Sequence, residues 1–152
     1  MSLTDIPDMF GTIHDEYAAR GFETELDLRG CVLKITTGEG LLYTYVVTIS
    51  WDRDGTRVTV EPGEDGRRLC DLEEISLITE INEWMSRGSV VMTRDRWILF
   101  RDRVPSGSSA LDVMMSVNHG IMVMERMTRF YNRKGCLHNG SSYFDVPYCK
   151  LH

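Results

Sequence analysis

Residues 41–60 read LLYTYVVTISWDRDGTRVTV, and this stretch decides the fold class. From Tyr43 to Trp51 every second residue is aromatic or β-branched, which is the period of a strand with one buried face. Asp52-Arg53-Asp54-Gly55 has the composition of a tight turn, and Val58 and Val60 continue the alternation beyond it. A connection this short joins only antiparallel strands. The stretch therefore predicts the central strand of a sheet and its antiparallel neighbour.

Three other stretches have the helical period, with apolar side chains three or four residues apart. Helices are expected from Thr4 to Arg20, from Asp71 to Met85 and from Ser109 to about Tyr131. The second and third stretches open with a capping side chain and an acid three residues later, which is the spacing of a capping box. Gly21 and Gly88 follow the first two helices, and glycine is the usual residue just beyond a helix end.

Four shorter stretches alternate like strands and lie between turn residues: 22–28, 31–35, 90–92 and 97–100. The element order is α-β-β-β(-β)-α-β-β-α, which predicts an α+β fold with an antiparallel sheet flanked by helices. The alternative is a parallel α/β sheet. The expected core comprises ten apolar side chains: Phe10, Tyr45, Val47, Ile49, Ile78, Ile81, Leu99, Val117, Ile121 and Met124.

Length and charge narrow the classes of function. The chain has 152 residues, which fits one domain over residues 1–152. Its 17 basic and 23 acidic residues leave a net charge of -6, which repels a phosphate backbone and an anionic membrane surface. We expect no nucleic-acid partner and no membrane partner. The longest apolar run is far short of the ~20 residues of a membrane span, and Met1 to Asp5 lacks the basic flank and apolar core of a signal peptide. A cytoplasmic location is therefore expected.

The third helix carries more apolar residues than a core-facing stripe needs. On a helical wheel, that stripe comprises Val113, Met114, Val117, Ile121, Met124, Met127 and Tyr131. Leu111, Met115 and Met122 fall outside it. Two interpretations stay open for this second patch. It packs under the C-terminal tail, or it is a surface for a protein partner, for which the adaptable methionine side chain is well suited.

The C-terminal tail offers a second chemistry, because Cys136, His138, Cys149 and His152 are residue types that bind zinc. The spacing of these residues is not that of a common zinc finger, and no feature of the sequence activates a catalytic cysteine. We therefore expect no metal or other cofactor, and keep a zinc protein or zinc enzyme as the alternative function.

Arginines gather around the last two predicted strands, at Arg94, Arg96, Arg101 and Arg103, where they alternate with acids. Charged residues on a strand discourage edge-to-edge pairing. The pattern predicts that these arginines lie on an exposed strand or in its turns, where they keep that segment soluble and prevent it from pairing with another strand.

Four segments also follow one another in a recognisable order: Glu80-Ile81-Asn82-Glu83-Trp84, Val90-Val91-Met92, 96–101 and 109–121. With the element order, they resemble the bacterial YbjN-like family of sensory transduction regulators, whose domains resemble type III secretion chaperones in fold. The resemblance covers Thr4 to Tyr131 and leaves 132–152 as a C-terminal extension. It implies a dimeric, non-enzymatic protein that acts through binding and brings no catalytic residues.

These observations favour a non-enzymatic protein-binding module, chaperone-like or regulatory, that forms a homodimer. Leu111, Met115 and Met122 are its expected partner-binding residues. The identity of the partner protein does not follow from the sequence.

Overall fold

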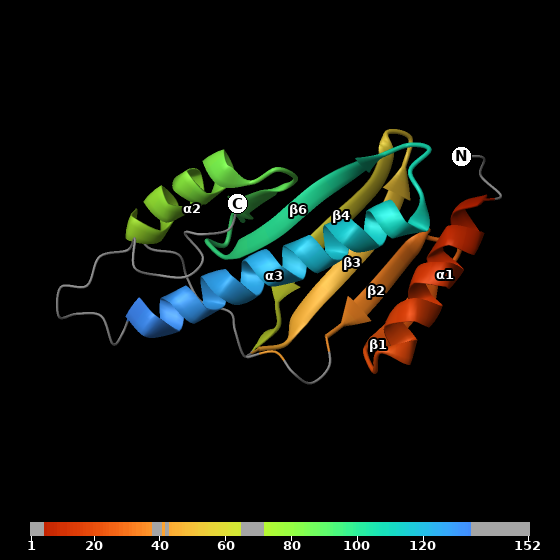
Figure 1. The fold of residues 1–152 in the computed structure, drawn as a ribbon, viewed down its shortest axis with the longest axis horizontal. Coiled ribbons are helices and arrows are strands. Elements are labelled where there is room, and N and C mark those ends of the chain that lie inside the picture. Colours follow the sequence, from red (N-terminus) through yellow and green to blue (C-terminus); the bar gives the residue numbers. More distant parts are fainter. Residues whose placement is uncertain (1–4, 38–40, 42, 65–71, 135–152) are drawn as a thin grey trace.

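The computed structural model describes residues 5–37, 41, 43–64 and 72–134, and these form three helices and six strands (Figure 1). The elements follow in the order α1 (Asp5–Ala19), β1 (Glu23–Asp27), β2 (Val32–Thr36), β3 (Tyr45–Asp52), β4 (Gly55–Pro62), α2 (Leu72–Trp84), β5 (Ser89–Met92), β6 (Ile98–Pro105) and α3 (Ala110–Lys134). This confirms the predicted α+β class and element order. α3 extends to Lys134, three residues beyond its expected end.

All six strands form one antiparallel sheet in the order β1-β2-β3-β4-β6-β5. The parallel alternative is therefore wrong. β6 lies between β4 and β5 and is hydrogen-bonded to both. The expectation that Arg101 and Arg103 keep their strand unpaired is also wrong, because they lie on an interior strand with only their side chains exposed.

The β3–β4 hairpin has the predicted turn, with Asp52 paired to Gly55. Gly55 has φ +132°, a conformation that side-chain-bearing residues rarely adopt. A Cβ at this position would also collide with the backbone carbonyl oxygen of Val104 on β6. Glycine here permits both the turn and the close approach of the next strand.

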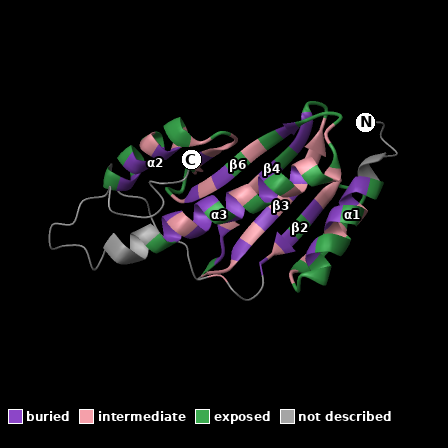
Figure 2. Cartoon of the chain, viewed as in Figure 1, coloured by how far each residue is buried: buried purple, intermediate pink, exposed green. Residues whose placement is uncertain are grey.

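The helices divide the sheet into a covered face and an open face. α1 packs on β1 and β2, and α3 packs on β4 and β6, from the same side of the sheet (Figure 1). Along β2, β3, β4 and β6 most side chains toward the helices are buried and the alternate ones are half-buried or exposed (Figure 2), whereas on β1 those toward the helices are half-buried. Among the described residues, no helix covers the second face, which we call the open face.

Nine of the ten predicted core residues are buried. Leu99 is the exception: it is half-buried and lines a hollow on the open face, because its neighbours Ile98 and Phe100 take the positions toward the helices. Gly120 brings α3 close to the sheet, since a Cβ there would overlap the Phe100 ring and lie 2.8 Å from a methyl of Val60.

α2 contacts β5, the edge strand at the end of the sheet. Its Asn82 side chain accepts a hydrogen bond from the Val90 backbone N–H and donates one to the Val90 carbonyl oxygen, both at 2.8 Å. These are backbone groups that a further strand would otherwise pair with. Asn82 therefore satisfies the edge of β5 at its centre.

Candidate functional site

The outward side of α3 carries the predicted partner-binding residues. Leu111, Met115 and Met122 are 63%, 52% and 39% exposed, and we call these three side chains the α3 stripe. They lie within about 40° of one another on the helical wheel. The prediction that they fall outside the core-facing arc is confirmed, and their role in binding stays a prediction. The alternative, that they pack under the C-terminal tail, concerns residues after Lys134, which lie outside the described part of the chain.

The start of α3 is fixed by the predicted capping box. The Ser109 hydroxyl accepts a hydrogen bond from the Asp112 backbone N–H at 3.2 Å, and Asp112 accepts one from the Ser109 backbone N–H at 3.0 Å. The backbone and hydroxyl donors of Ser109 lower the pKa of Asp112. A charged Asp112 also interacts favourably with the positive end of the helix dipole.

Two tyrosines from other elements set the rotation of α3 about its axis. The hydroxyl of Tyr17 on α1 donates to Asn118 Oδ1 at 2.7 Å, and that of Tyr45 on β3 donates to Glu125 Oε2 at 2.6 Å. Burial raises the pKa of Tyr17 to about 12, and burial together with Glu125 raises the pKa of Tyr45 further. Both phenols stay protonated and keep donating, which leaves the α3 stripe directed away from the sheet.

A second candidate surface is a hollow of about 700 Å³ over β4, β6 and β5. Its charged lining includes Arg57, Arg101 and Arg103, whose side chains project from the open face. Arg57 and Arg103 are paired across the two strands, and Arg101 is paired with Thr59 of β4 and Ser89 of β5. We call this hollow the arginine pocket.

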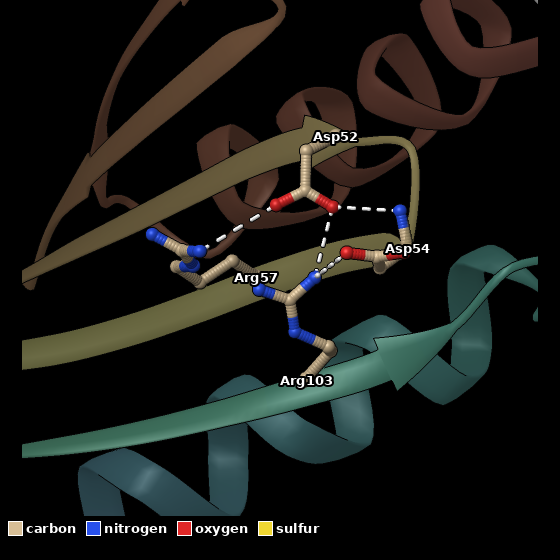
Figure 3. A network of polar contacts seen from close by, with 4 residues as sticks. All are labelled: Asp52, Asp54, Arg57 and Arg103. Carbon is tan, nitrogen blue, oxygen red and sulfur yellow. Dashed lines mark hydrogen bonds and ion pairs between the residues drawn. The ribbon is translucent and has the colours of Figure 1, made fainter.

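Acids from the β3–β4 turn neutralise part of this charge. Figure 3 shows the Asp52 carboxylate between two guanidinium groups, 2.9 Å from Nη1 of Arg103 and 3.5 Å from Nη2 of Arg57. Asp54 lies 3.7 Å from Arg103. The hydrogen bond from the Asp54 backbone N–H lowers the pKa of Asp52 most, and the positive charges of Arg103 and Arg57 lower it further. Two like charges directly opposite each other repel, and the Asp52 carboxylate between them offsets this repulsion.

On the covered side, Asp102 joins three elements. It accepts hydrogen bonds from Ser116 Oγ of α3 at 2.7 Å and from Arg87 Nε, in the turn before β5, at 3.2 Å. Nearby, His119 stacks edge-on against Phe100, and burial lowers the pKa of its imidazole. The Ser116 hydroxyl therefore donates its proton to a hydrogen bond with Asp102. The described contacts of the cluster hold the α2–β5 turn against β6 and α3.

The zinc hypothesis concerns residues that lie outside the described part of the chain, since Cys136, His138, Cys149 and His152 all follow Lys134. Within the described ranges, no three His, Cys, Asp or Glu side chains are grouped so that they could hold a metal ion. Of the helices in these ranges, none has the length and apolar character needed to cross a membrane.

Comparisons of the chain with protein-family models, curated proteins and solved structures found no match. The resemblance to the YbjN-like family therefore stays a prediction. The α+β fold is shown by the helices and the antiparallel sheet of the structure and does not depend on these comparisons.

The sequence did not reveal the arginine pocket. Its third arginine, Arg57, lies more than forty residues before Arg101 and Arg103, and only the pairing of β4 with β6 brings the three together. The signal present in the sequence was the alternation of Arg101 and Arg103, which places both on one face of a strand.

Proposed function

We propose that this chain is a non-enzymatic protein-binding module, chaperone-like or regulatory, that acts in the cytoplasm as a homodimer. The α3 stripe, formed by Leu111, Met115 and Met122, is its contact with a partner protein. The observation that carries the proposal is the exposure of three long apolar side chains in line on a helix whose rotation is fixed by Tyr17 and Tyr45.

The surroundings of the stripe define the chemistry of the partner. Arg126 and Arg129 lie on the same side of α3, one and two turns beyond Met122. Arg129 is exposed and lies 3.3 Å from the buried Glu125, which balances its charge. The positive charge at the end of the stripe therefore comes from Arg126. A segment with apolar side chains followed by acids fits this order. The two flexible methionines suit a surface that adapts to its partner.

The resemblance to the YbjN-like family, and through it to secretion chaperones, supports the hypothesis of a protein-binding module, because it implies a dimer that acts by binding. Membership of that family is part of the proposal.

Site-specific photocrosslinking tests the stripe. A photoreactive amino acid replaces Met115 or Met122 in the full chain, and the matched control carries it at Leu28, which is 55% exposed in the turn between β1 and β2. We expect positions 115 and 122 to capture the same apolar and acidic segment of one protein, and position 28 not to capture it.

A synthetic peptide of the captured segment then binds the wild-type chain, and Met115→Glu weakens binding by at least about tenfold, or 1.4 kcal/mol. Two results would overturn the proposal: the same adducts from position 28, or equal affinity of the peptide for the wild-type chain and Met115→Glu.

A further inference from the structure

Charges on the open face are sorted by strand. The register places the same-level residues of five strands in rows, and one row reads Glu25, Lys34, Thr48, Thr59 and Arg101 from β1 to β6. The next row reads Asp27, Val32, Ser50, Arg57 and Arg103. Across these five strands, each row therefore runs from an acid on β1 to an arginine on β6, and the first row continues to Ser89 of β5.

The arginines of these rows differ in whether they have partners within the chain. Arg57 and Arg103 bind Asp52 within their own chain, whereas no described residue forms an ion pair or hydrogen bond with the Arg101 side chain. Glu25 and Asp27, on edge strand β1, have exposed side chains. Oδ1 of Asp27 accepts hydrogen bonds from the backbone N–H groups of Arg29 and Gly30. Adjacent strands are about 4.8 Å apart, so Glu25 and Arg101 of one chain are separated by about 19 Å and cannot meet.

We infer that a second copy of this chain packs on the open face, related by a two-fold axis parallel to the strands and centred on β3. The inference rests on the proposed homodimer and assigns its interface. Such an axis places β1 of one copy over β6 of the other, β2 over β4, and β3 over itself.

The direction of the axis follows from charge complementarity. A two-fold axis along the strands reverses the order of the strands in the second copy but leaves each row at the same position along the strands. Glu25 therefore faces Arg101 of the other copy, and Asp27 faces Arg103 of the other copy. An axis in the interface across the strands would instead place β1 over β1 and oppose like charges, which costs several kcal/mol. The acids of β1 then enter the arginine pocket.

The centre of the open face suits close contact between two sheets. Most of its side chains are small and half-buried, namely Val32, Val46, Thr48, Ser50 and Thr59. The long side chains of Lys34 and Arg57 lie in the same rows and are exposed. Facing sheets pack about 10 Å apart. β1 and β2 have five residues each and β3, β4 and β6 have eight, about 17 Å and 26 Å of strand, so the five strands present roughly 540 Å² per subunit. The total of about 1,100 Å² lies just below the size of standard specific interfaces, which predicts a weak dimer.

Charge reversal and subunit mixing test this geometry. Arg101→Glu and Glu25→Arg each create two symmetric like-charge contacts, and we expect either variant to weaken self-association by at least about tenfold in sedimentation velocity. An equimolar mixture of the two variants restores the dimer, because each acid then faces an arginine in the other subunit. Rescue within one chain is excluded by the distance between the two positions.

The control is Arg94→Glu, an equal charge change in the exposed β5–β6 turn, which leaves self-association unchanged. Melting temperatures of all variants show that each one folds. A wild-type chain that is monomeric at about 100 μM, above the dissociation constant of a weak specific interface, overturns the inference and the homodimer together. A dimer that both variants retain, or single variants that stay monomeric when mixed, overturns the interface alone. Crosslinking at Met115 tests the α3 stripe independently.

Discussion

At the scale of single residues, two glycines in helix interiors show how packing outweighs helix propensity. Gly120 of α3 lies where a Cβ would overlap the Phe100 ring, whereas a Cβ at Gly11 of α1 meets no atom within 4 Å. Alanine favours the helix over glycine by about 0.8 to 1.0 kcal/mol at either position. We expect Gly11→Ala to stabilise the fold by up to about 1 kcal/mol, and Gly120→Ala to destabilise it by about 1 to 3 kcal/mol through overpacking.

Urea unfolding of the two variants measures both effects, and each serves as the control for the other. Equal stabilisation by the two substitutions would contradict the close approach of α3 to Phe100 and Val60.

A buried tyrosine gives stability a dependence on alkaline pH. Burial raises the pKa of Tyr17 to about 12 from its ordinary 10.0. The folded chain therefore keeps a proton that the unfolded chain loses, so this contribution to stability is complete below pH 10 and lost as pH rises toward 12. Tyr17→Phe removes the hydrogen bond to Asn118, so we expect its free energy of unfolding at pH 7 to be about 0.5 to 1.5 kcal/mol lower than that of the wild-type chain. We also expect the stability of the variant to fall less as the pH rises above 10. Urea unfolding from pH 8 to pH 11.5 should show the two stability curves converging; parallel curves would contradict this role of the phenol.

At the scale of elements, α2 protects the edge of the sheet through one side chain. Asn82→Leu removes both hydrogen bonds to Val90 and leaves a donor and an acceptor on the edge strand unsatisfied. The expected cost is about 1 to 3 kcal/mol per group that stays buried. Hydrogen exchange of the Val90 amide should become faster, while Glu83→Ala, at the exposed neighbouring position, leaves it unchanged. Unaltered exchange in Asn82→Leu would show that β5 is protected by other means.

Helices and strands differ in how well their own sequence predicts which of their side chains are buried and which residues they contact. The strand at residues 45–52 and the core-facing side of α3 followed from periodicity, because period 2 and period 3.6 directly report which residues share a face. Leu99 was misplaced because the short apolar run around it has no clear alternation. The role of Asn82 and the meeting of Arg57 with Arg103 depend on strand order and register, which arise from contacts distant in sequence.

At the scale of the whole molecule, the two candidate surfaces lie on opposite sides of the sheet. α3 lies on one side of the sheet (Figure 1), and its exposed stripe is on the side of the helix away from the strands. The arginine pocket is lined by side chains of the open face. A dimer joined through the open faces would carry one α3 stripe on each outer side. Such a dimer could hold two partner segments, or two parts of one segment, and gain affinity from the second contact.

Ionic strength distinguishes this dimer from one joined through apolar side chains. Ion pairs between exposed groups contribute about 0.2 to 1 kcal/mol each, and the two-fold axis repeats the pairs of Glu25 and Asp27 with the arginines of β6. Raising the salt from ~0.05 M to ~0.5 M shortens the screening length from about 14 Å to about 4 Å and weakens these pairs. We expect the dissociation constant to rise on the order of tenfold, or 1.4 kcal/mol, in sedimentation velocity of the wild-type chain. Contact between two α3 stripes would instead be unchanged or strengthened by salt, because burial of Leu111, Met115 and Met122 is not an electrostatic effect. A dissociation constant that stays constant or falls as salt rises would therefore place the dimer contact on the helical side and contradict the charge-paired interface.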